Sequence, residues 1–136
     1  MVSSKVSRSL LFSLVFICAA CSYSHGVKRV LTLENEINDL TCISSALENM
    51  GFETRMRNKI NMDYVATTKP KTEGFSIVIT APNTLTHRRD YGSAPQSCKT
   101  VKPFAKLMEK NEVKFLEVCG LNLSRKPTEE IKCHWR

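Results

Sequence analysis

The chain has 136 residues, of which 42% are hydrophobic and 24% are charged, and its formal net charge at pH 7 is +7. These proportions are typical of globular proteins, and they exclude a wholly disordered chain, a collagen and a repeat array. The length allows one domain, because a domain takes roughly 100–200 residues. No catalytic or metal-binding motif stands out. The sequence therefore predicts export and disulfide bonds more specifically than it predicts a function.

Residues 1–20 have the three parts of a secretory signal peptide. Lys5 and Arg8 give a positively charged start without an acidic residue, and an apolar run ending in small residues occupies positions 10–20. This run is too short to cross a bilayer, which takes about 20 apolar residues. We therefore expect the protein to be exported and residues 1–20 to be removed.

The end of this leader, Ile17-Cys-Ala-Ala-Cys-Ser22, resembles the lipobox of bacterial lipoproteins. In that family small residues precede a cysteine that is lipidated and becomes the first residue of the mature protein. The resemblance implies that Cys21 is the acylated residue and that the protein is anchored in the cell envelope. Residues 21–29 would then form a short polar tether, and residues 30–136 a single α+β domain.

Ordinary signal cleavage after Ser22 or Ser24 is the alternative, since small residues occupy the recognition positions before both. It would give a soluble extracellular protein. In either case Lys5 and Arg8 are lost, which lowers the net charge from +7 to +5. No second long apolar run follows, so we expect no transmembrane helix in the mature chain.

The cysteine count also indicates an oxidising compartment. Four cysteines remain beyond the leader and Cys21, an even number that favours disulfide bonds; they are Cys42, Cys98, Cys119 and Cys133. A zinc site is not expected, because these four cysteines include no Cys-x-x-Cys pair, and no cofactor is indicated.

Sequence alone permits three pairings of four cysteines, and one has a geometric argument. A hairpin of residues 113–123 with residues 130–135 would place Cys119 opposite Cys133, within reach of a disulfide. This predicts a Cys119–Cys133 bond and leaves Cys42 to pair with Cys98.

The mature chain starts with a predicted helix between Thr32, a suitable N-cap, and Gly51, a suitable stop. Its apolar stripe has spacings of three and four residues, at Leu33, Ile37, Leu40, Ser44 and Leu47. Alternating or apolar runs then predict three strands, at Phe52–Asn58, Ile60–Thr68 and Phe75–Thr80.

Residues 81–97 are polar and lack a period, so they are predicted to form a long surface loop. A second helix follows, with Pro103 expected in its first turn; its apolar face consists of Val101, Phe104, Leu107 and Met108. Residues 113–123 and 130–135 are read as strands. The predicted class is α+β, a disulfide-linked antiparallel sheet of four to five strands with two helices on one face.

Two groups of basic residues are candidate binding sites. Arg55, Arg57 and Lys59 alternate along a predicted strand and so share one face. The second group crowns the predicted loop and consists of His87, Arg88, Arg89 and Asp90. Such surfaces suit anionic lipid, a polyanionic cell-surface polymer or a protein, although a solvated face that keeps the protein soluble gives the same pattern. Nucleic acid is not expected, because aromatic platforms are lacking.

The interpretation we favour is an exported, lipid-anchored envelope protein with a non-catalytic binding or structural accessory role at a membrane surface. A soluble secreted effector or inhibitor that binds another protein through residues 81–97 is one alternative. A small basic hydrolase resembling a nuclease is the other, with His87 as its acid–base residue. No catalytic residue is assigned, because serine-hydrolase, zincin and phosphate-loop motifs are all missing from the sequence.

Overall fold

The computed structural model describes residues 25–59, 62–69 and 72–134. The predicted signal peptide, Cys21 and the first residues of the predicted tether lie outside these ranges. In chain order the elements are β1 (Gly26–Thr32), α2 (Thr41–Asn49), β2 (Glu53–Lys59), β3 (Met62–Lys69), β4 (Thr72–Ala81), β5 (Thr84–Asp90), α3 (Cys98–Val118) and β6 (Thr128–Lys132).

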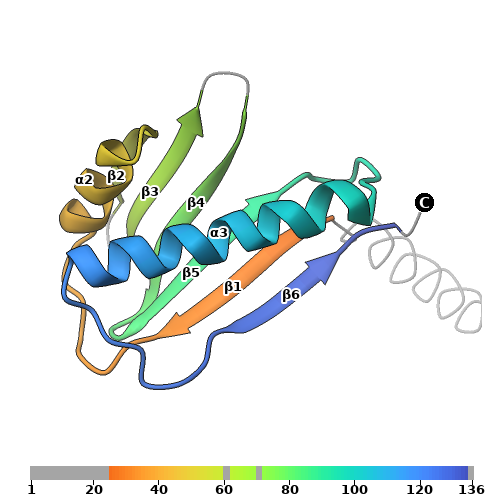
Figure 1. The fold of residues 1–136 in the computed structure, drawn as a ribbon. Helices are drawn as coiled ribbons and strands as arrows, with labels where there is room; N and C mark the ends of the chain where they lie inside the picture. Colours follow the sequence, from red (N-terminus) through yellow and green to blue (C-terminus); the bar gives the residue numbers. More distant parts are fainter. Residues whose placement is uncertain (1–24, 60–61, 70–71, 135–136) are drawn as a thin grey trace, which may run out of the picture.

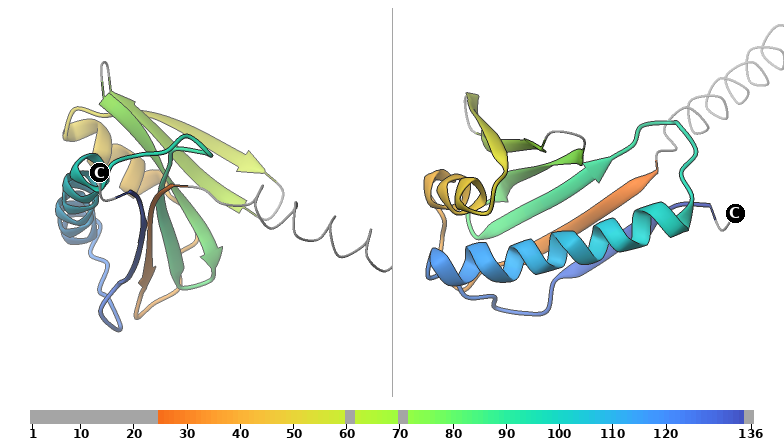
Figure 2. Two further views of the ribbon diagram at one scale, coloured as in Figure 1. Left: turned by 90° about the vertical axis from the view of Figure 1, so that its right-hand side faces the viewer. Right: turned by 45° about the horizontal axis from the view of Figure 1, so that its top comes forward.

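The strands form one antiparallel sheet in the order β2-β3-β4-β5-β1-β6. Both helices lie on the same side of this sheet (Figures 1 and 2). We call that side the helix face and the opposite side the outer face. The predicted α+β class, with two helices over one face of an antiparallel sheet, is confirmed. The sheet in the described part of the chain has six strands, slightly more than predicted.

The hydrophobic core lies between the helix face and the two helices. Alternate strand residues point into it, as the two-residue period of a strand requires. Each large apolar side chain that is fully buried contributes on the order of 1.5–3 kcal/mol. The largest of these side chains are Leu31, Leu33, Leu40, Ile43, Leu47, Ile77, Leu85, Met108 and Phe115.

The first strand, β1, corrects two predictions about the start of the mature chain. Residues 26–29 belong to this strand, so the tether cannot extend to residue 29 as predicted. The helix predicted from Thr32 begins only at Thr41, because Leu31 and Leu33 are buried as part of β1 and the bridge after it. Their spacing of two is a strand period, which the helical stripe concealed.

Strand β5 overturns the predicted long loop. Residues 84–90 pair with β4 on one side and with β1 on the other, so this strand is central in the sheet. Only residues 91–97 remain as the connection to α3. The candidate residues His87, Arg88, Arg89 and Asp90 are therefore held by backbone hydrogen bonds on two sides.

Helix α3 is longer than predicted and runs through residues that were expected to form a strand. The strand prediction for residues 113–123 is wrong, because the helix continues to Val118. Phe115 and Leu116 extend its buried stripe. The predicted hairpin is lost as a result, and β6 pairs with β1 instead.

Pro103 was expected in the first turn of this helix, but it lies further inside. Proline has no N–H, so one intrahelical hydrogen bond is missing there. The buried neighbours Val101 and Ala105 keep the helix continuous by packing on the sheet. Neither helix in the described residues is both long enough and apolar enough to span a membrane.

The structure contains two disulfides, as the cysteine count predicted, but their pairing differs from the prediction. Cys42 is bonded to Cys119, and Cys98 to Cys133, with Cα–Cα distances of 5.9 and 5.0 Å. The predicted pairing is wrong because Cys119 follows the end of α3 and does not lie on a strand opposite Cys133.

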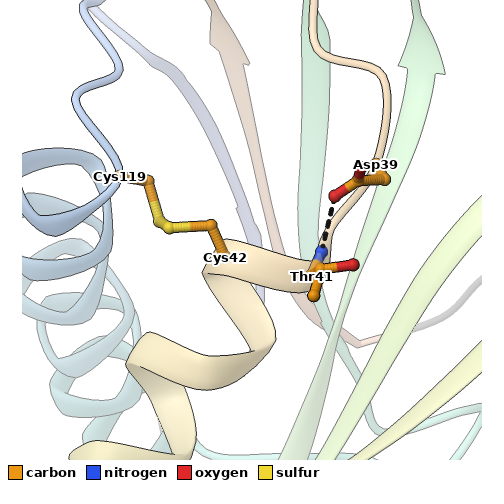
Figure 3. The surroundings of a disulfide bond; sticks show 4 residues. All are labelled: Asp39, Thr41, Cys42 and Cys119. Atoms are coloured by element: carbon orange, nitrogen blue, oxygen red, sulfur yellow. Dashed lines mark hydrogen bonds between the residues drawn. A yellow bond between two sulfur atoms is a disulfide. The ribbon is translucent and has the colours of Figure 1, made fainter.

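Each disulfide ties α3 to another part of the fold. Figure 3 shows Cys42, near the start of α2, joined to Cys119 at the end of α3. Asp39 supports the same turn, since its carboxylate accepts a hydrogen bond of 3.0 Å from the Thr41 backbone N–H. At the other end of α3, Cys98 is joined to Cys133, which follows β6.

Candidate functional site

The predicted loop group is divided between the two faces of the sheet, because neighbouring strand residues point to opposite sides. His87 is fully buried on the helix face, and its ring contacts Phe75 at a centroid distance of 4.6 Å. Arg89 lies on the same face and donates a hydrogen bond of 2.8 Å to the Gly74 carbonyl. Arg88 and Asp90 are exposed and lie on the outer face.

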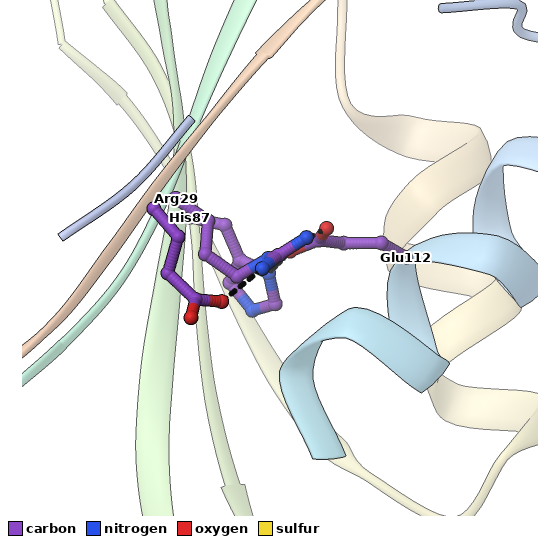
Figure 4. Close-up of polar contacts among 4 residues, drawn as sticks. Arg29, His87 and Glu112 are labelled. Atoms are coloured by element: carbon purple, nitrogen blue, oxygen red, sulfur yellow. Dashed lines mark hydrogen bonds and ion pairs between the residues drawn. The ribbon is translucent and has the colours of Figure 1, made fainter. Parts of the chain in front are cut away.

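A buried ion cluster surrounds His87. The strand register places Arg29 of β1 directly between His87 of β5 and Glu129 of β6. Glu112 of α3 approaches this row from the helix side (Figure 4). Its carboxylate accepts hydrogen bonds from the Arg29 Nε–H at 2.8–2.9 Å and from the His87 Nδ1–H at 2.7 Å. Arg29 also forms an ion pair with Glu129.

The charges of this cluster follow from burial and pairing. Burial disfavours the charged guanidinium of Arg29, but hydrogen bonds and attraction from Glu112 and Glu129 outweigh this effect and raise its pKa. For His87 burial is the largest influence, and it lowers the pKa despite the hydrogen bond to Glu112. These directions favour a charged guanidinium on Arg29 and a neutral imidazole on His87.

This cluster has the components of an acid–base pair but no access for a substrate. His87 and Arg29 have exposed fractions of 0% and 5%, and Glu112 has 2%. The Nε2 atom of His87 makes no hydrogen bond within the described part of the chain. A substrate would reach that atom only if α3 left the sheet. The geometry therefore assigns these three residues to holding α3 on β1 and β5.

The lowered pKa of His87 makes stability depend on pH. Below the ordinary histidine pKa of about 6.5, the His87 imidazole is protonated in the unfolded chain but stays neutral in the folded chain. The free energy of unfolding should therefore fall by up to about 1.4 kcal/mol per pH unit as the pH drops from about 6.5 towards the folded pKa of His87. Urea denaturation at a series of pH values measures this slope.

Substitution of His87 separates this effect from other titrations. His87→Gln should reduce the slope, because it removes the imidazole whose pKa is lowered. An equal slope in the His87→Gln protein and the parent would show that His87 is not the residue responsible.

A pocket of about 180 Å³ lies at the end of the sheet where β1 begins and where β5 and β6 end. Its lining residues come from these three strands and the residue before β1: His25, Gly26, Val27, Lys28, Arg88, Arg89, Asp90, Glu130 and Lys132. Most of them occupy the outer-face positions of their strands. The volume is below the 300–1,000 Å³ typical of sites for drug-sized ligands, so it suits a single small group.

The floor of this pocket depends on a glycine. Gly26 lies between Asp90 and Lys132 in the strand register. A Cβ atom at this position would stand 2.2 Å from the Arg89 carbonyl oxygen, which is too close for any side chain. Glycine therefore permits the close approach of β1 and β5 beside the pocket.

The pocket is basic, and its carboxylates are already engaged. Lys132 forms an ion pair with Glu130 at 3.4 Å, and the Asp90 carboxylate accepts a hydrogen bond of 2.7 Å from the Gly92 N–H. Lys28 and Arg88 are exposed, lie directly opposite each other, and make no ion pair with any other described residue. Two cations are thus left to face a ligand.

The predicted basic face of β2 lies on the same side of the sheet but apart from this pocket. The cross-strand row runs from Lys28 and Arg88 through Ser76 and Ala66 to Arg55. Neighbouring strands are about 4.8 Å apart, so Arg55 lies about 19 Å from Lys28 along the sheet. Arg57 is also exposed, and Lys59 is the last residue of β2.

The described residues contain no group of three or more His, Cys, Asp and Glu side chains able to hold a metal ion. Sequence reasoning named Arg88, Arg89 and Asp90 of the pocket, but it missed the contributions of β1 and β6. It also missed Arg29 and Glu112, whose charges suggested exposed positions. Arg29 occupies an inward position in the two-residue apolar pattern of β1, and Glu112 one in the three-to-four-residue apolar pattern of α3. From these positions the burial of both residues could have been predicted. No family model matches this chain, and no curated protein or solved structure is detectably similar to it.

Proposed function

We propose that this chain is an exported, non-catalytic binding protein anchored to a membrane of the cell envelope through an acylated Cys21, with the basic pocket at the start of β1 as its binding site. The main support for export is the pair of disulfides, because such bonds persist in oxidising compartments outside the cytosol. Lys28 and Arg88, which form no ion pair with another described residue, line a small pocket and so support binding of an anionic group.

The burial of His87 weighs against the hydrolase alternative. That interpretation depended on His87 at an exposed loop tip, whereas the residue is fully buried beneath α3. The soluble effector alternative also loses its long binding loop, because residues 84–90 form the central strand β5. Its remaining support is the outer face of the sheet, which neither described helix covers (Figure 2).

Membrane fractionation tests the anchor directly. In the native host, the parent protein should sediment with membranes and partition into detergent, and Cys21→Ser should release it, because the thiol that accepts the lipid is gone. Intact mass before and after reduction reports the acyl groups, the cleavage site and the two disulfides together. Cys18→Ser is the matched control, because it lies in the predicted leader. A parent protein that is soluble and unacylated would contradict the anchor and favour the soluble secreted alternative.

A further inference from the structure

The pocket and the proposed anchor lie close together along the chain. His25 lines the pocket, and Cys21 precedes it by four residues. An extended chain spans at most about 3.6 Å per residue, so the Cα atoms of Cys21 and His25 are within about 14 Å of each other in any conformation. A lipid on Cys21 would therefore hold the pocket beside the headgroups of the same membrane.

The unpaired charges of the pocket match those headgroups. Resting on the proposed function, we propose that Lys28 and Arg88 bind the phosphate of an anionic phospholipid in the membrane that holds the acylated chain. The guanidinium of Arg88 can donate two parallel hydrogen bonds to phosphate oxygens, and the ammonium of Lys28 adds a compact positive charge. The pocket volume of about 180 Å³ suits a single group of the size of a phosphate.

The arrangement of the fold agrees with this orientation. Lys28 and Arg88 are exposed and occupy outer-face positions of β1 and β5. Both described helices lie on the opposite side of the sheet (Figure 2). The Cys98–Cys133 disulfide fastens the chain just after Lys132, which fixes β6 and its share of the pocket wall. Arg55, about 19 Å away along the sheet, lies beyond the screening length of about 8 Å at physiological salt. The charge of Arg55 should therefore attract a headgroup at the pocket only weakly.

Vesicle binding by the Cys21→Ser chain tests the pocket separately from the anchor. The probes are phosphatidylcholine vesicles with and without phosphatidylglycerol, compared by co-sedimentation at physiological salt. We expect binding only to the anionic vesicles. The double substitution Lys28→Gln with Arg88→Gln should weaken it by about thirtyfold, because each basic residue near an anionic surface accounts for about a fivefold effect.

The matched control removes the same charge from the same face. Arg55→Gln with Arg57→Gln also lowers the net charge by two, and it should weaken vesicle binding by less than about threefold. Near-ultraviolet circular dichroism and the count of free thiols show that both variants keep the fold and its disulfides.

Three results would overturn the proposal: no binding to anionic vesicles, equal losses in the two double variants, or binding of inorganic phosphate at the pocket without binding of vesicles. The second would indicate diffuse attraction of the whole face, and the third a soluble phosphate ligand. Because the tested chain has no acyl acceptor, these outcomes are independent of the anchor. Failure of the proposed function would show instead as an unacylated Cys21 in the native protein.

Discussion

Glu112→Gln should lower the free energy of unfolding by about 3–5 kcal/mol, the usual cost of removing one partner from a buried ion pair. Glu112 is 2% exposed, and it is the acceptor for both Arg29 and His87. Without its charge, the 5%-exposed guanidinium of Arg29 keeps only Glu129, which is itself partly exposed. The amide NH₂ of the new glutamine would also face Arg29 and His87, both of which donate hydrogen bonds to Glu112 in the parent protein. Urea denaturation measures the loss.

Two further variants locate the cause of this loss. Glu109→Gln removes an exposed carboxylate from the same helix and should change the free energy of unfolding by no more than about 0.5 kcal/mol. Adding Arg29→Met to Glu112→Met should recover much of the stability, because replacing a whole buried pair by apolar groups is often neutral or favourable. Equal stability of Glu112→Gln and Glu109→Gln would contradict the role assigned to the cluster.

Removing the Cys42–Cys119 disulfide should have an effect of similar size. The bond closes a sequence separation of 77 residues, and in the chain-entropy model a loop of that length corresponds to about 4.5 kcal/mol. Helix α2 has only 9 residues, too few to be stable without tertiary contacts. The double substitution Cys42→Ala with Cys119→Ala should therefore lower the melting temperature by well over 10 °C, measured by calorimetry.

The second disulfide provides the matched comparison. Cys98→Ala with Cys133→Ala opens a separation of 35 residues, for which the same model gives about 3.8 kcal/mol. The two variants should therefore lose similar amounts of the free energy of unfolding. Hydrogen exchange should distinguish them, because the backbone amides of α2 should lose protection in the first variant and those of β6 in the second. Loss of protection at the same segment in both variants would contradict the separate attachments described above.

The fold class could be predicted from the sequence, since strands β2, β3 and β4 and the apolar stripe of α3 have clear periods. Strand β1 and strand β5 were missed for one shared reason. Each places a polar residue among the inward positions of its alternating pattern: Arg29 stands between Val27 and Leu31, and His87 follows Leu85. A charged or titratable residue at such a position is read as exposed, because burial without a partner is costly.

Helix α3 was cut short by the same effect. Its buried stripe passes through Met108, Glu112 and Phe115, and the glutamate interrupted the apolar pattern where the helix continues. The three residues that concealed two strands and the last part of a helix are the ones that bind one another in the folded protein. Their contacts join positions 83 and 25 residues apart, and such pairing is not visible in a local pattern.

The pocket was partly predictable for a similar reason. Arg88 and Asp90 were singled out as a cluster of mixed charge, and they do line it. Lys28 was missed because it lay in the predicted tether, and Lys132 because its strand was paired with the wrong partner. Cross-strand register decides which charges face each other, and a register cannot be read from one strand alone.

The position of β1 in the sheet has a consequence for the timing of assembly during synthesis. This strand lies between β5 and β6, so its last neighbour is made about a hundred residues after it. At about 5–20 residues per second, a ribosome takes on the order of 5–20 s to produce the missing partner. Through that interval Val27 and Leu31 have no completed sheet to enter. The nascent polypeptide therefore cannot complete its sheet before its final segment leaves the ribosome.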